Sequence, residues 1–283
     1  MSIQFTKLNG LGNDYHFSEA DNSPGVDWPE LSRQMSHRHL GAGADGIILI
    51  KAGTTHDFAM RIFNADGSEA ETCGNGIRCY AKYVFERGMT DKTEFVIETL
   101  AGPNAVVLTV EDGKVVSVRS NMGQPKFDRA EIPMAGAPGP VKEEAIEIAG
   151  TTMRVTCANI GNPHAVVFVE DATAIELTDI GPKVEQHASF PEKTNVEFVN
   201  IIDRDNIVMR IWERGSGITM ASGSGSCGAA LAAMITERVN RSVNVHLVFG
   251  VLTIEWAEDG CVYQEGPATE AYSGTWDHEI PMV

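Results

Sequence analysis

The chain has 283 residues, of which 43% are hydrophobic, and its formal net charge is −17 at pH 7. Such a length suits two domains of about 140 residues, each large enough to bury a core. The acidic balance argues against nucleic acid and against an anionic membrane surface, because both require a basic face on the protein. The opening MSIQFTKLNG lacks the basic region and apolar run of a signal peptide, and no window approaches the roughly 18 apolar residues of a membrane span. We therefore expect an acidic cytoplasmic protein.

The cysteine content predicts free thiols. Five cysteines is an odd number, which argues against a disulfide framework in a cytosolic chain. Cys73 and Cys79 are six residues apart with no second pair, so no Cys/His cluster has the spacing of a zinc site. We expect no structural metal.

In the first half of the chain, hydrophobic periodicity predicts short strands around one long helix. An extended run with a Gly-rich turn opens the chain, and the helix ending at Arg87 repeats apolar residues at helical spacing before the stop signal Gly88. The predicted elements, in order, are the extended run Ile3–Phe17, a short helix Pro29–His39, strands Gly46–Lys51 and Asp57–Phe63, the helix Gly76–Arg87, and strands Phe95–Thr99, Ala105–Glu111 and Lys114–Ser120. Asp112-Gly113 predicts a tight hairpin between the last two strands.

The second half predicts the same kinds of element after a Pro/Gly-rich crossing at Pro133–Val141. Its long helix is rich in alanine, which favours tight packing. The predicted elements are strands Met153–Ala158 and Ala165–Val169, a helix Ile175–Glu185, strands Asn195–Asp203 and Asn206–Trp212, the helix Gly225–Arg238, and strands Val243–Phe249, Val251–Ala257 and Cys261–Gln264.

The two halves share an internal repeat. An offset of 149 residues, which carries Cys73 onto Ser222, lays Ala59–Gly76 without a gap over Val208–Gly225. The same offset lays Gly12-Asn13 over Gly161-Asn162, and Glu111-Asp112-Gly113 meets Glu258-Asp259-Gly260 at an offset of 147. Three matches in chain order indicate a duplicated half.

The repeat predicts an α+β fold of two pseudo-symmetric domains, each a strand-rich sheet around a central helix, with an active site in the cleft between them. The first domain covers residues 1–125 and carries Cys73, and the segment 265–283 is expected to pack back on it. The second domain covers residues 126–283 and carries Ser222.

Cys73 stands at the predicted start of a helix, where the helix dipole and unpaired backbone N–H groups stabilise a thiolate. Such a position lowers a cysteine pKa from about 8.5 to roughly 3.5–7.5. Gly74 and Gly76 let the backbone approach a ligand closely, and the same N–H groups can bind a carboxylate. The repeat places Ser222 at the matching helix start, so two groups could act on opposite faces of one carbon.

A lone cysteine before a helix is more often a packed small residue than a base, and only the repeat at Ser222 changes that balance. Cys79 and Cys227 fall just inside the two helices and are interpreted as packing residues. Cys157 and Cys261 fall on predicted strands and are expected in the core.

Several blocks, in order, resemble diaminopimelate epimerases. They are FTKLNGLGNDY at the start, GADG, FNADGSEAETCGNGIRC, GNPH at Gly161–His164, FPEKTNVEF at Phe190–Phe198, ERGSGITMASGSG and the terminal GPATEAYSG. The blocks run from Phe5 to Gly274, so the resemblance covers nearly the whole chain. It implies a cofactor-independent epimerase that interconverts LL- and meso-2,6-diaminopimelate in the lysine and peptidoglycan pathway, with two pseudo-symmetric domains, and it allows a homodimer.

The resemblance also implies site residues. The first catalytic cysteine of the family falls on Cys73, and the second falls on Ser222, where the family pattern Ala-Cys-Gly-Ser/Thr-Gly meets Ala-Ser-Gly-Ser-Gly. His164 and Glu213 match the pair that supports the acid and base groups. The implied substrate-binding residues are Asn13, Asn64, Gly74, Asn75, Asn162, Asn195, Glu213, Arg214, Gly223 and Ser224.

These residue types suit an amino-acid substrate. Arg214 can meet a carboxylate in a two-pronged contact, and asparagines offer donors and acceptors to an ammonium–carboxylate centre. The backbone N–H groups at Gly74-Asn75 and Gly223-Ser224 could clamp the reacting α-carboxylate. Without a cofactor, a closed dry cavity must stabilise the developing charge. Without the resemblance, the asparagines would be interpreted as turn residues and Arg214 as a surface charge.

Ser222 predicts an impaired enzyme, because a serine hydroxyl is a far weaker acid than a thiol and is rarely a base without an activating partner. Two alternatives stay open at this point. One is a dehydratase or racemase of the same superfamily that acts on another amino acid. The other is a binding protein that has lost catalysis, which calorimetric affinity for diaminopimelate without isomer conversion would favour.

Overall fold

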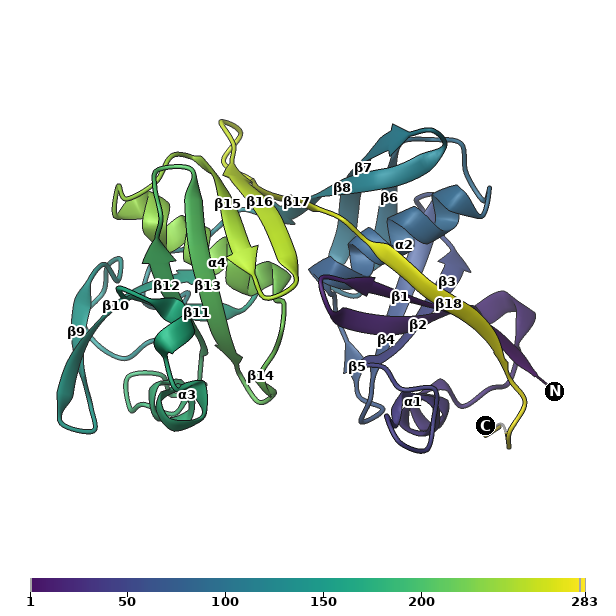
Figure 1. The fold of residues 1–283 in the computed structure, drawn as a ribbon, viewed down its shortest axis with the longest axis horizontal. Coiled ribbons are helices and arrows are strands. Elements are labelled where there is room, and N and C mark those ends of the chain that lie inside the picture. Colours follow the sequence, from purple (N-terminus) through teal and green to yellow (C-terminus); the bar gives the residue numbers. More distant parts are fainter. Residues whose placement is uncertain (1, 280, 283) are drawn as a thin grey trace. The chain divides into compact units, whose positions relative to one another are not determined.

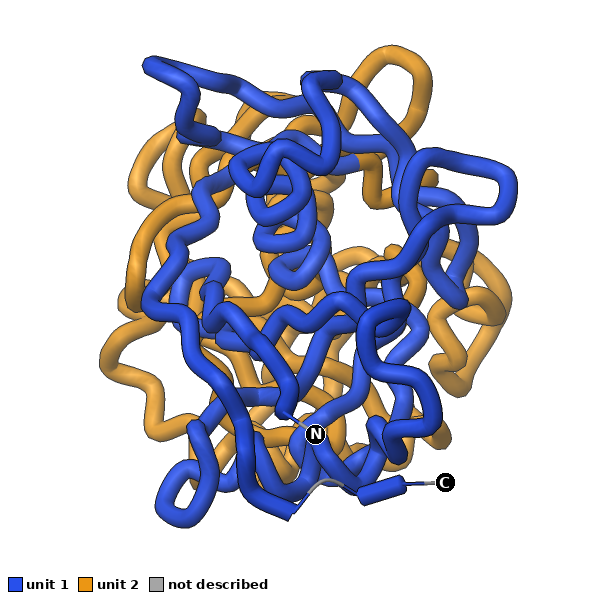
Figure 2. The backbone as a smooth tube through the Cα atoms, turned by 90° about the vertical axis from the view of Figure 1, so that its right-hand side faces the viewer, with its two compact units in different colours: residues 1–120, 266–283 blue, residues 121–265 orange. Residues whose placement is uncertain are grey.

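The computed structural model describes residues 2–279 and 281–282 and divides the chain into two compact units (Figures 1 and 2). Unit 1 contains residues 1–120 and 266–283, and unit 2 contains residues 121–265. The sequence predicts a boundary after residue 125. Within the described part of the chain, no helix is long and apolar enough to cross a membrane.

Unit 1 is a sheet in the order β18-β1-β2-β3-β4-β6-β7-β8, with the short β5 at the end of β4. The pairs β2–β3 and β4–β6 are parallel, and the other pairs are antiparallel. The strands are β1 (Ile3–Gly10), β2 (Asn13–Glu19), β3 (Gly46–Ala52), β4 (Phe58–Asn64), β5 (Glu69–Ala70), β6 (Glu94–Thr99), β7 (Gly102–Glu111), β8 (Lys114–Gly123) and β18 (Thr269–Trp276). The helical elements are η1 (Ala20–Asn22), α1 (Trp28–Ser36) and α2 (Gly74–Glu86).

Unit 2 is a sheet in the order β9-β10-β11-β12-β13-β15-β16-β17, with β14 at the end of β13. The strands are β9 (Glu144–Ile148), β10 (Thr151–Asn159), β11 (Pro163–Phe168), β12 (Asn195–Ile201), β13 (Asn206–Glu213), β14 (Gly217–Ile218), β15 (Ser242–Leu247), β16 (Gly250–Trp256) and β17 (Val262–Gly266). The helical elements are η2 (Ala172–Ala174), α3 (Leu177–Glu185) and α4 (Gly223–Ile235).

The duplication predicted from sequence is confirmed by the strand registers. In unit 1, Tyr15 of β2 lies opposite Gly46 of β3, and in unit 2, His164 of β11 lies opposite Asn195 of β12. Both pairs are parallel and are related by the offset of 149 residues that links Cys73 to Ser222. The same offset carries α2 onto α4, so one supersecondary plan is built twice.

Besides the short β5 and β14, two longer strands that the sequence analysis does not predict complete these sheets. β18 pairs antiparallel with β1, with Phe5 opposite Gly274, and β9 pairs antiparallel with β10, with Met153 opposite Ile146. In Figure 1 the yellow β18 lies along the purple β1, although the two are at opposite ends of the chain. The pairing explains why residues 266–283 belong to unit 1.

The tight turn after β7 is confirmed. Glu111 lies opposite Lys114, and Asp112 and Gly113 both have positive φ, 48° and 75°. Positive φ at both central residues is what a two-residue hairpin of type I′ requires. The core position predicted for Cys261 is wrong: this residue precedes β17 and is half-buried, because its N–H is held by Asp259 Oδ1 (2.8 Å) in a turn.

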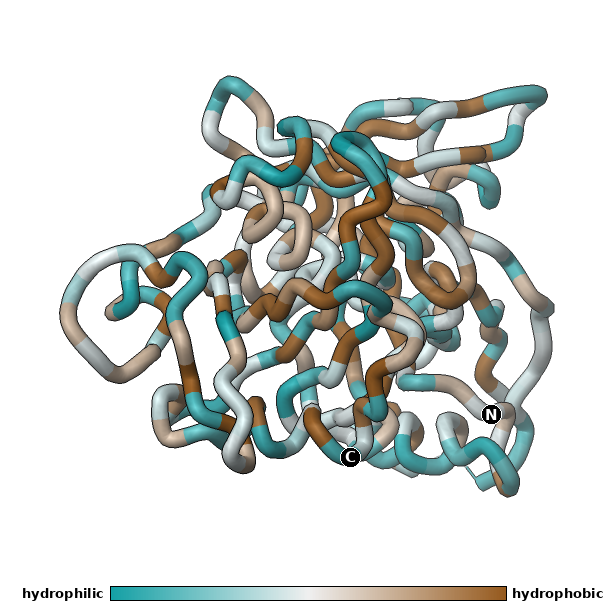
Figure 3. Tube along the Cα trace, turned by 60° about the vertical axis from the view of Figure 1, so that its left-hand side comes forward, coloured by the Kyte–Doolittle hydropathy of each residue, from teal (hydrophilic) through white to brown (hydrophobic). Residues whose placement is uncertain are grey.

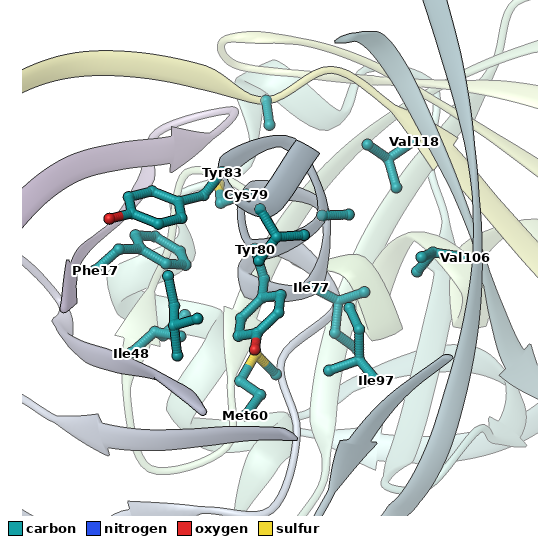
Figure 4. Close-up of a cluster of buried hydrophobic side chains, with 14 of the residues drawn as sticks. Phe17, Ile48, Met60, Ile77, Cys79, Tyr80, Tyr83, Ile97, Val106 and Val118 are labelled. Atoms are coloured by element: carbon teal, nitrogen blue, oxygen red, sulfur yellow. The ribbon is translucent and has the colours of Figure 1, made fainter. Parts of the chain in front are cut away.

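In unit 1, the strands surround α2 with their apolar side chains (Figure 4). The rings of Phe17 and Tyr83 stack with centroids 6.1 Å apart, and the Tyr80 side chain extends toward Met60. The other face of the sheet packs on α1, where Trp28 and its neighbours form a second core. Burying both faces of a sheet under helices is the usual way to exclude water from its side chains.

In unit 2, α4 is apolar nearly all round, and its residues from Gly225 to Ala233 are buried against the strands. A helix with no polar face is stable only when it is enclosed. On the opposite face, Leu177 and Val184 of α3 pack into a core with Phe198 of β12. Figure 3 shows hydrophobic residues along the inner segments and hydrophilic residues along many of the outer loops.

His16 of β2 is completely buried in unit 1, and among the described residues neither of its ring nitrogens has a hydrogen-bond partner. Its ring packs edge-on against Phe5, with centroids 4.9 Å apart. Burial and, to a lesser extent, the charge of Lys7 lower the pKa of His16 to about 4. The folded protein therefore holds this imidazole neutral through a range in which the unfolded chain protonates it.

This difference predicts a loss of stability in acid. Between pH 6.5 and 4 the unfolded state binds a proton that the folded state does not bind. The contribution of His16 to the free energy of unfolding is therefore fully present above pH 6.5, and about 3 kcal/mol of it is lost on acidification to pH 4. His16→Phe keeps a ring against Phe5 and should remove this part of the pH dependence. Urea midpoints at pH 7 and pH 4.5 measure it, with exposed His56→Phe as the control. An equal acid loss in His16→Phe and the parent would contradict the assignment.

Candidate active site

The α2 helix begins at Gly74, with Cys73 as its N-cap in an extended conformation (φ −151°, ψ 113°). The cysteine sulfur accepts the backbone N–H of Gly76 at 3.4 Å, as an N-cap side chain does. A side chain at Gly76 would place its Cβ 2.6 Å from Ile48 Cδ1, so a larger residue there requires the Ile48 side chain to move. The helix starts two residues earlier than predicted, and Cys73 therefore stands at the positive end of its dipole.

Two side chains from β2 contact the Cys73 sulfur. The Tyr15 hydroxyl donates to Sγ at 3.6 Å, and the thiol donates to Asn13 Oδ1 at 3.5 Å. Cys73 is half-buried, whereas Tyr15 is only 6% exposed. The sulfur thus lies where a helix start and a strand converge, and it remains partly open to solvent.

Asn13 and Asn75, both predicted to bind substrate, are linked in unit 1. Asn75 Nδ2 donates to Asn13 Oδ1 at 3.1 Å, and Asn13 Nδ2 donates to Asp45 Oδ2 at 2.6 Å. The fully buried Arg78 donates to Asn75 Oδ1 at 2.8 Å and to the Pro267 carbonyl at 3.2 Å. The network fixes both amides beside Cys73, so their orientation is set before any ligand arrives.

Ser222 occupies the corresponding place in unit 2. It is the N-cap of α4, extended at φ −133° and ψ 122°, and its Oγ accepts the Gly225 N–H at 3.2 Å. Ser226 Oγ donates to the Ser222 carbonyl at 2.8 Å, and a Cβ at Gly225 would lie 2.5 Å from Ile211 Cδ1. Gly223 and Ser224 form the first helical residues, as Gly74 and Asn75 do in α2. The two helix starts have the same local geometry, and the atom at the cap differs.

His164 is completely buried between two polar groups of unit 2. Its Nδ1 lies 2.6 Å from Glu197 Oε1, and its Nε2 lies 2.8 Å from Asn162 Oδ1. Because an amide oxygen can only accept, Nε2 carries a hydrogen. Burial raises the pKa of Glu197, which is also fully enclosed. Gly228 of α4 makes room for this histidine, since a Cβ there would lie 2.7 Å from His164 Cγ.

The remaining predicted residues lie at the ends of strands. Asn195 Nδ2 donates to the Pro163 carbonyl at 2.8 Å, and its Oδ1 accepts the Arg214 N–H at 2.9 Å, so this amide ties β11 to the chain after β13. The Arg214 guanidinium donates to the Glu192 carbonyl at 3.3 Å. Glu213 Oε1 accepts the Thr219 hydroxyl at 2.6 Å.

Asn64 ends β4 in unit 1, where its Nδ2 donates to Ser68 Oγ at 3.0 Å. The structure therefore brings together Asn13, Cys73 and Asn75 in unit 1. In unit 2 it brings together Asn162 with His164, and Asn195 with Arg214.

The polar residues at these sites that are absent from the predicted set include Tyr15, Asp45, Arg78 and Glu197. Each falls inside a sequence block that was recognised, and Glu197 interrupts the apolar strand run NVEFVNI. A carboxylate in such a run signals a buried partner, because an unpaired buried charge is costly. Within residues 2–279 and 281–282, no three His, Cys, Asp or Glu side chains are arranged to hold a metal ion.

A family model described as diaminopimelate epimerase matches residues 5–127 and 156–270. The chain belongs to the diaminopimelate epimerase family. A diaminopimelate epimerase of Moorella thermoacetica is 50% identical over 275 residues, which cover 96% of this chain and 98% of the relative. Another, from Methanococcus maripaludis, is 45% identical over 276 residues, which cover 97% of this chain and all of the relative.

Solved structures with low sequence identity share the fold. A Bacillus anthracis phenazine biosynthesis protein of the PhzF family aligns over 97% of this chain and 99% of its own, with a TM-score of 0.70 and 16% identity. A hydroxyproline epimerase from Agrobacterium vitis aligns over 97% of this chain and 92% of its own, with a TM-score of 0.67 and 16% identity. The duplicated α+β architecture of this diaminopimelate epimerase family member is therefore a recurrent one.

Proposed function

We propose that this chain is an isomerase of LL- and meso-2,6-diaminopimelate in which Cys73 is a working base and Ser222 is a defective one. The observation that carries the proposal is the Cys73 thiol at the N-cap of α2, with its sulfur in contact with Gly76 N–H and Tyr15 OH. The named relatives, 44–50% identical over nearly the full chain, support the substrate and disfavour a dehydratase of another amino acid.

The proposed chemistry is the removal of the α-proton by the Cys73 thiolate and the return of a proton to the opposite face of the carbon. A helix N-terminus lowers the free energy of the thiolate, which makes it available near neutral pH. The reverse reaction exchanges the two roles, so each stereoisomer requires its own base. No cofactor takes part in this scheme.

The substrate-binding assignments remain part of the proposal. The N–H groups at Gly74-Asn75 and Gly223-Ser224 would bind the reacting α-carboxylate, because the first turn of a helix directs its N–H donors and the positive end of its dipole at an anion. The remaining groups, which would hold the ammonium and carboxylate of the unreactive end, are Asn13, Asn64, Asn162, Asn195, Glu213 and Arg214.

His164 would support the acid and base groups through its neighbours. It is completely buried and bound at both ring nitrogens, by Glu197 and Asn162. A group in that position can orient a neighbouring amide and adjust the local charge.

Ser222 is the group in this mechanism that lacks the acidity to act as a base. Its Oγ accepts the Gly225 N–H, a contact that stabilises an oxyanion but supplies no base to remove the hydroxyl proton. A serine hydroxyl needs such a base to ionise at neutral pH. We therefore expect exchange of the α-proton in the stereoisomer that Cys73 serves, and slow conversion between isomers. We also propose that the enzyme is cytoplasmic, binds no nucleic acid and can form a homodimer.

The test is proton NMR of LL- and meso-diaminopimelate incubated separately with the protein in heavy water. Loss of the α-proton signal from one isomer, with little conversion, is the expected result. Conversion at full enzymic rates would overturn the assignment of Ser222 as a defective base. No exchange in either isomer would overturn the assignment of Cys73 as a base for this substrate.

A further inference from the structure

Tyr15 occupies a position that the duplication uses twice. Its counterpart in the repeat is His164, 149 residues further on. Tyr15 lies opposite Gly46 on the neighbouring parallel strand, and His164 lies opposite Asn195 in the same way. His164 donates from Nε2 to Asn162, whereas the Tyr15 hydroxyl reaches the helix cap itself, at Cys73 Sγ. Each unit thus places a hydrogen-bonding ring at the same strand position, and only unit 1 directs it at a sulfur.

The Tyr15 ring is held rigidly. It is 6% exposed and packs in the unit 1 core with α2 and β3. Burial, the charge of a Cys73 thiolate and the charge of Asp45 raise the pKa of the Tyr15 hydroxyl well above its usual value. The hydroxyl therefore keeps its proton at neutral pH and remains a donor there.

The Cys73 sulfur lies between hydrogen-bond donors and an acceptor of its proton. Tyr15 OH and Gly76 N–H point at Sγ from 3.6 and 3.4 Å, and Asn13 Oδ1 accepts the thiol proton at 3.5 Å. Donors to sulfur favour the thiolate, while an acceptor of its proton favours the thiol. The neutral Asn13 amide is fixed by Asp45 and Asn75, so it does not turn away easily.

We infer that Tyr15 is a positioning residue that sets the acidity of Cys73 by donating its hydroxyl hydrogen to the sulfur. The Gly76 contact has its counterpart in the Gly225 N–H at Ser222, so it does not distinguish the two units. Tyr15 is a side-chain contribution that unit 1 has and unit 2 lacks. The catalytic meaning of this inference depends on the proposed function, but its test needs no substrate.

Other ionisable groups face the same region. Asp45 precedes β3 and reaches Tyr15 through Asn13. Arg78 of α2 donates to Asn75, and Asn75 donates to the same Asn13 oxygen that accepts the Cys73 thiol. Cys79 lies on α2 one turn and a half further on, where burial raises its thiol pKa to about 12. None of these groups is altered when the Tyr15 hydroxyl alone is removed, so that substitution isolates the contact.

The experiment measures the rate at which iodoacetamide alkylates Cys73 from pH 5 to 10, resolved by mass spectrometry of the peptide that contains it. Thiolate sulfur displaces iodide, so the profile reports the thiol pKa. Tyr15→Phe keeps the ring and removes the donor. We expect its Cys73 profile to move to higher pH, with alkylation at pH 7 slower by about three- to tenfold.

The matched control is Tyr80→Phe, which removes another buried hydroxyl from the same core. Tyr80 OH donates to the Ala59 carbonyl at 3.0 Å and belongs to the helix that Cys73 caps. This variant should leave the Cys73 profile in place. An equal shift in both variants would show a general loosening of the core and would overturn the inference.

A second replacement works in the opposite direction. A 3-fluorotyrosine at position 15 keeps the ring and hydroxyl but is a more acidic, stronger donor, and it should move the Cys73 profile to lower pH. Parent-like profiles for both Tyr15→Phe and the fluorinated chain would overturn the inference. Neither result depends on diaminopimelate. The proposed function is tested separately, by the exchange experiment in heavy water.

Discussion

Replacing Ser222 with cysteine should raise the rate of conversion between LL- and meso-diaminopimelate by about 10²–10⁴-fold, the range of a positioned acid–base group. The N-cap geometry is already suitable. Ser222 and Cys73 share extended backbone angles and the same contact to the N–H three residues on, so a thiol at position 222 would occupy the place that the sulfur has in unit 1. The helix dipole would then favour its thiolate.

Polarimetry or chiral chromatography of the reaction, started from each isomer, measures the gain. Ser242→Cys is the control, because it adds a thiol at an exposed position of the same unit, at the start of β15 and outside the proposed site. Its rate should stay at the parent value. If Ser222→Cys also stays there while it folds normally, the account of Ser222 as the defective base is wrong.

Replacing Cys73 with serine should reduce exchange of the α-proton by about 10²–10⁴-fold, because the remaining hydroxyl cannot ionise at neutral pH. The change is small in volume and keeps an acceptor for the Gly76 N–H, so we expect the helix cap to persist. NMR in heavy water follows the remaining exchange. Cys261→Ser is the control, since this cysteine is also half-buried but lies before β17 of unit 2.

The double variant Cys73→Ser/Ser222→Cys makes this test directional. It moves the single thiol from one helix cap to the other, so exchange should appear in the stereoisomer that the parent leaves unexchanged. Exchange of the same isomer in the parent and the double variant would contradict a two-base mechanism with one base at each cap. Undiminished exchange in Cys73→Ser would contradict the role of Cys73 itself.

The two helix caps could be predicted from sequence because their determinants are local and repeated. A cap residue, two glycines and a following apolar run define a helix start within one turn, and the same run occurs 149 residues later. The hairpin at Asp112-Gly113 was predictable for the same reason, since positive φ at both residues is a property of the pair. The strands on either side carry enough alternation or apolar character to be recognised individually.

What the sequence determined by itself is therefore the duplicated plan, the family and the pair Cys73 and Ser222. The tertiary structure decided the rest. β18 joins β1 across almost the whole chain length, and β9 joins β10, because the edges of the sheets need partners and no local pattern says which segment supplies them. In the same way, Tyr15 meets Cys73 over 58 residues and His164 meets Glu197 over 33, and such contacts exist only once strands and helices have packed. The residue type determines which interactions a side chain can make, whereas tertiary packing decides which partner atom it meets.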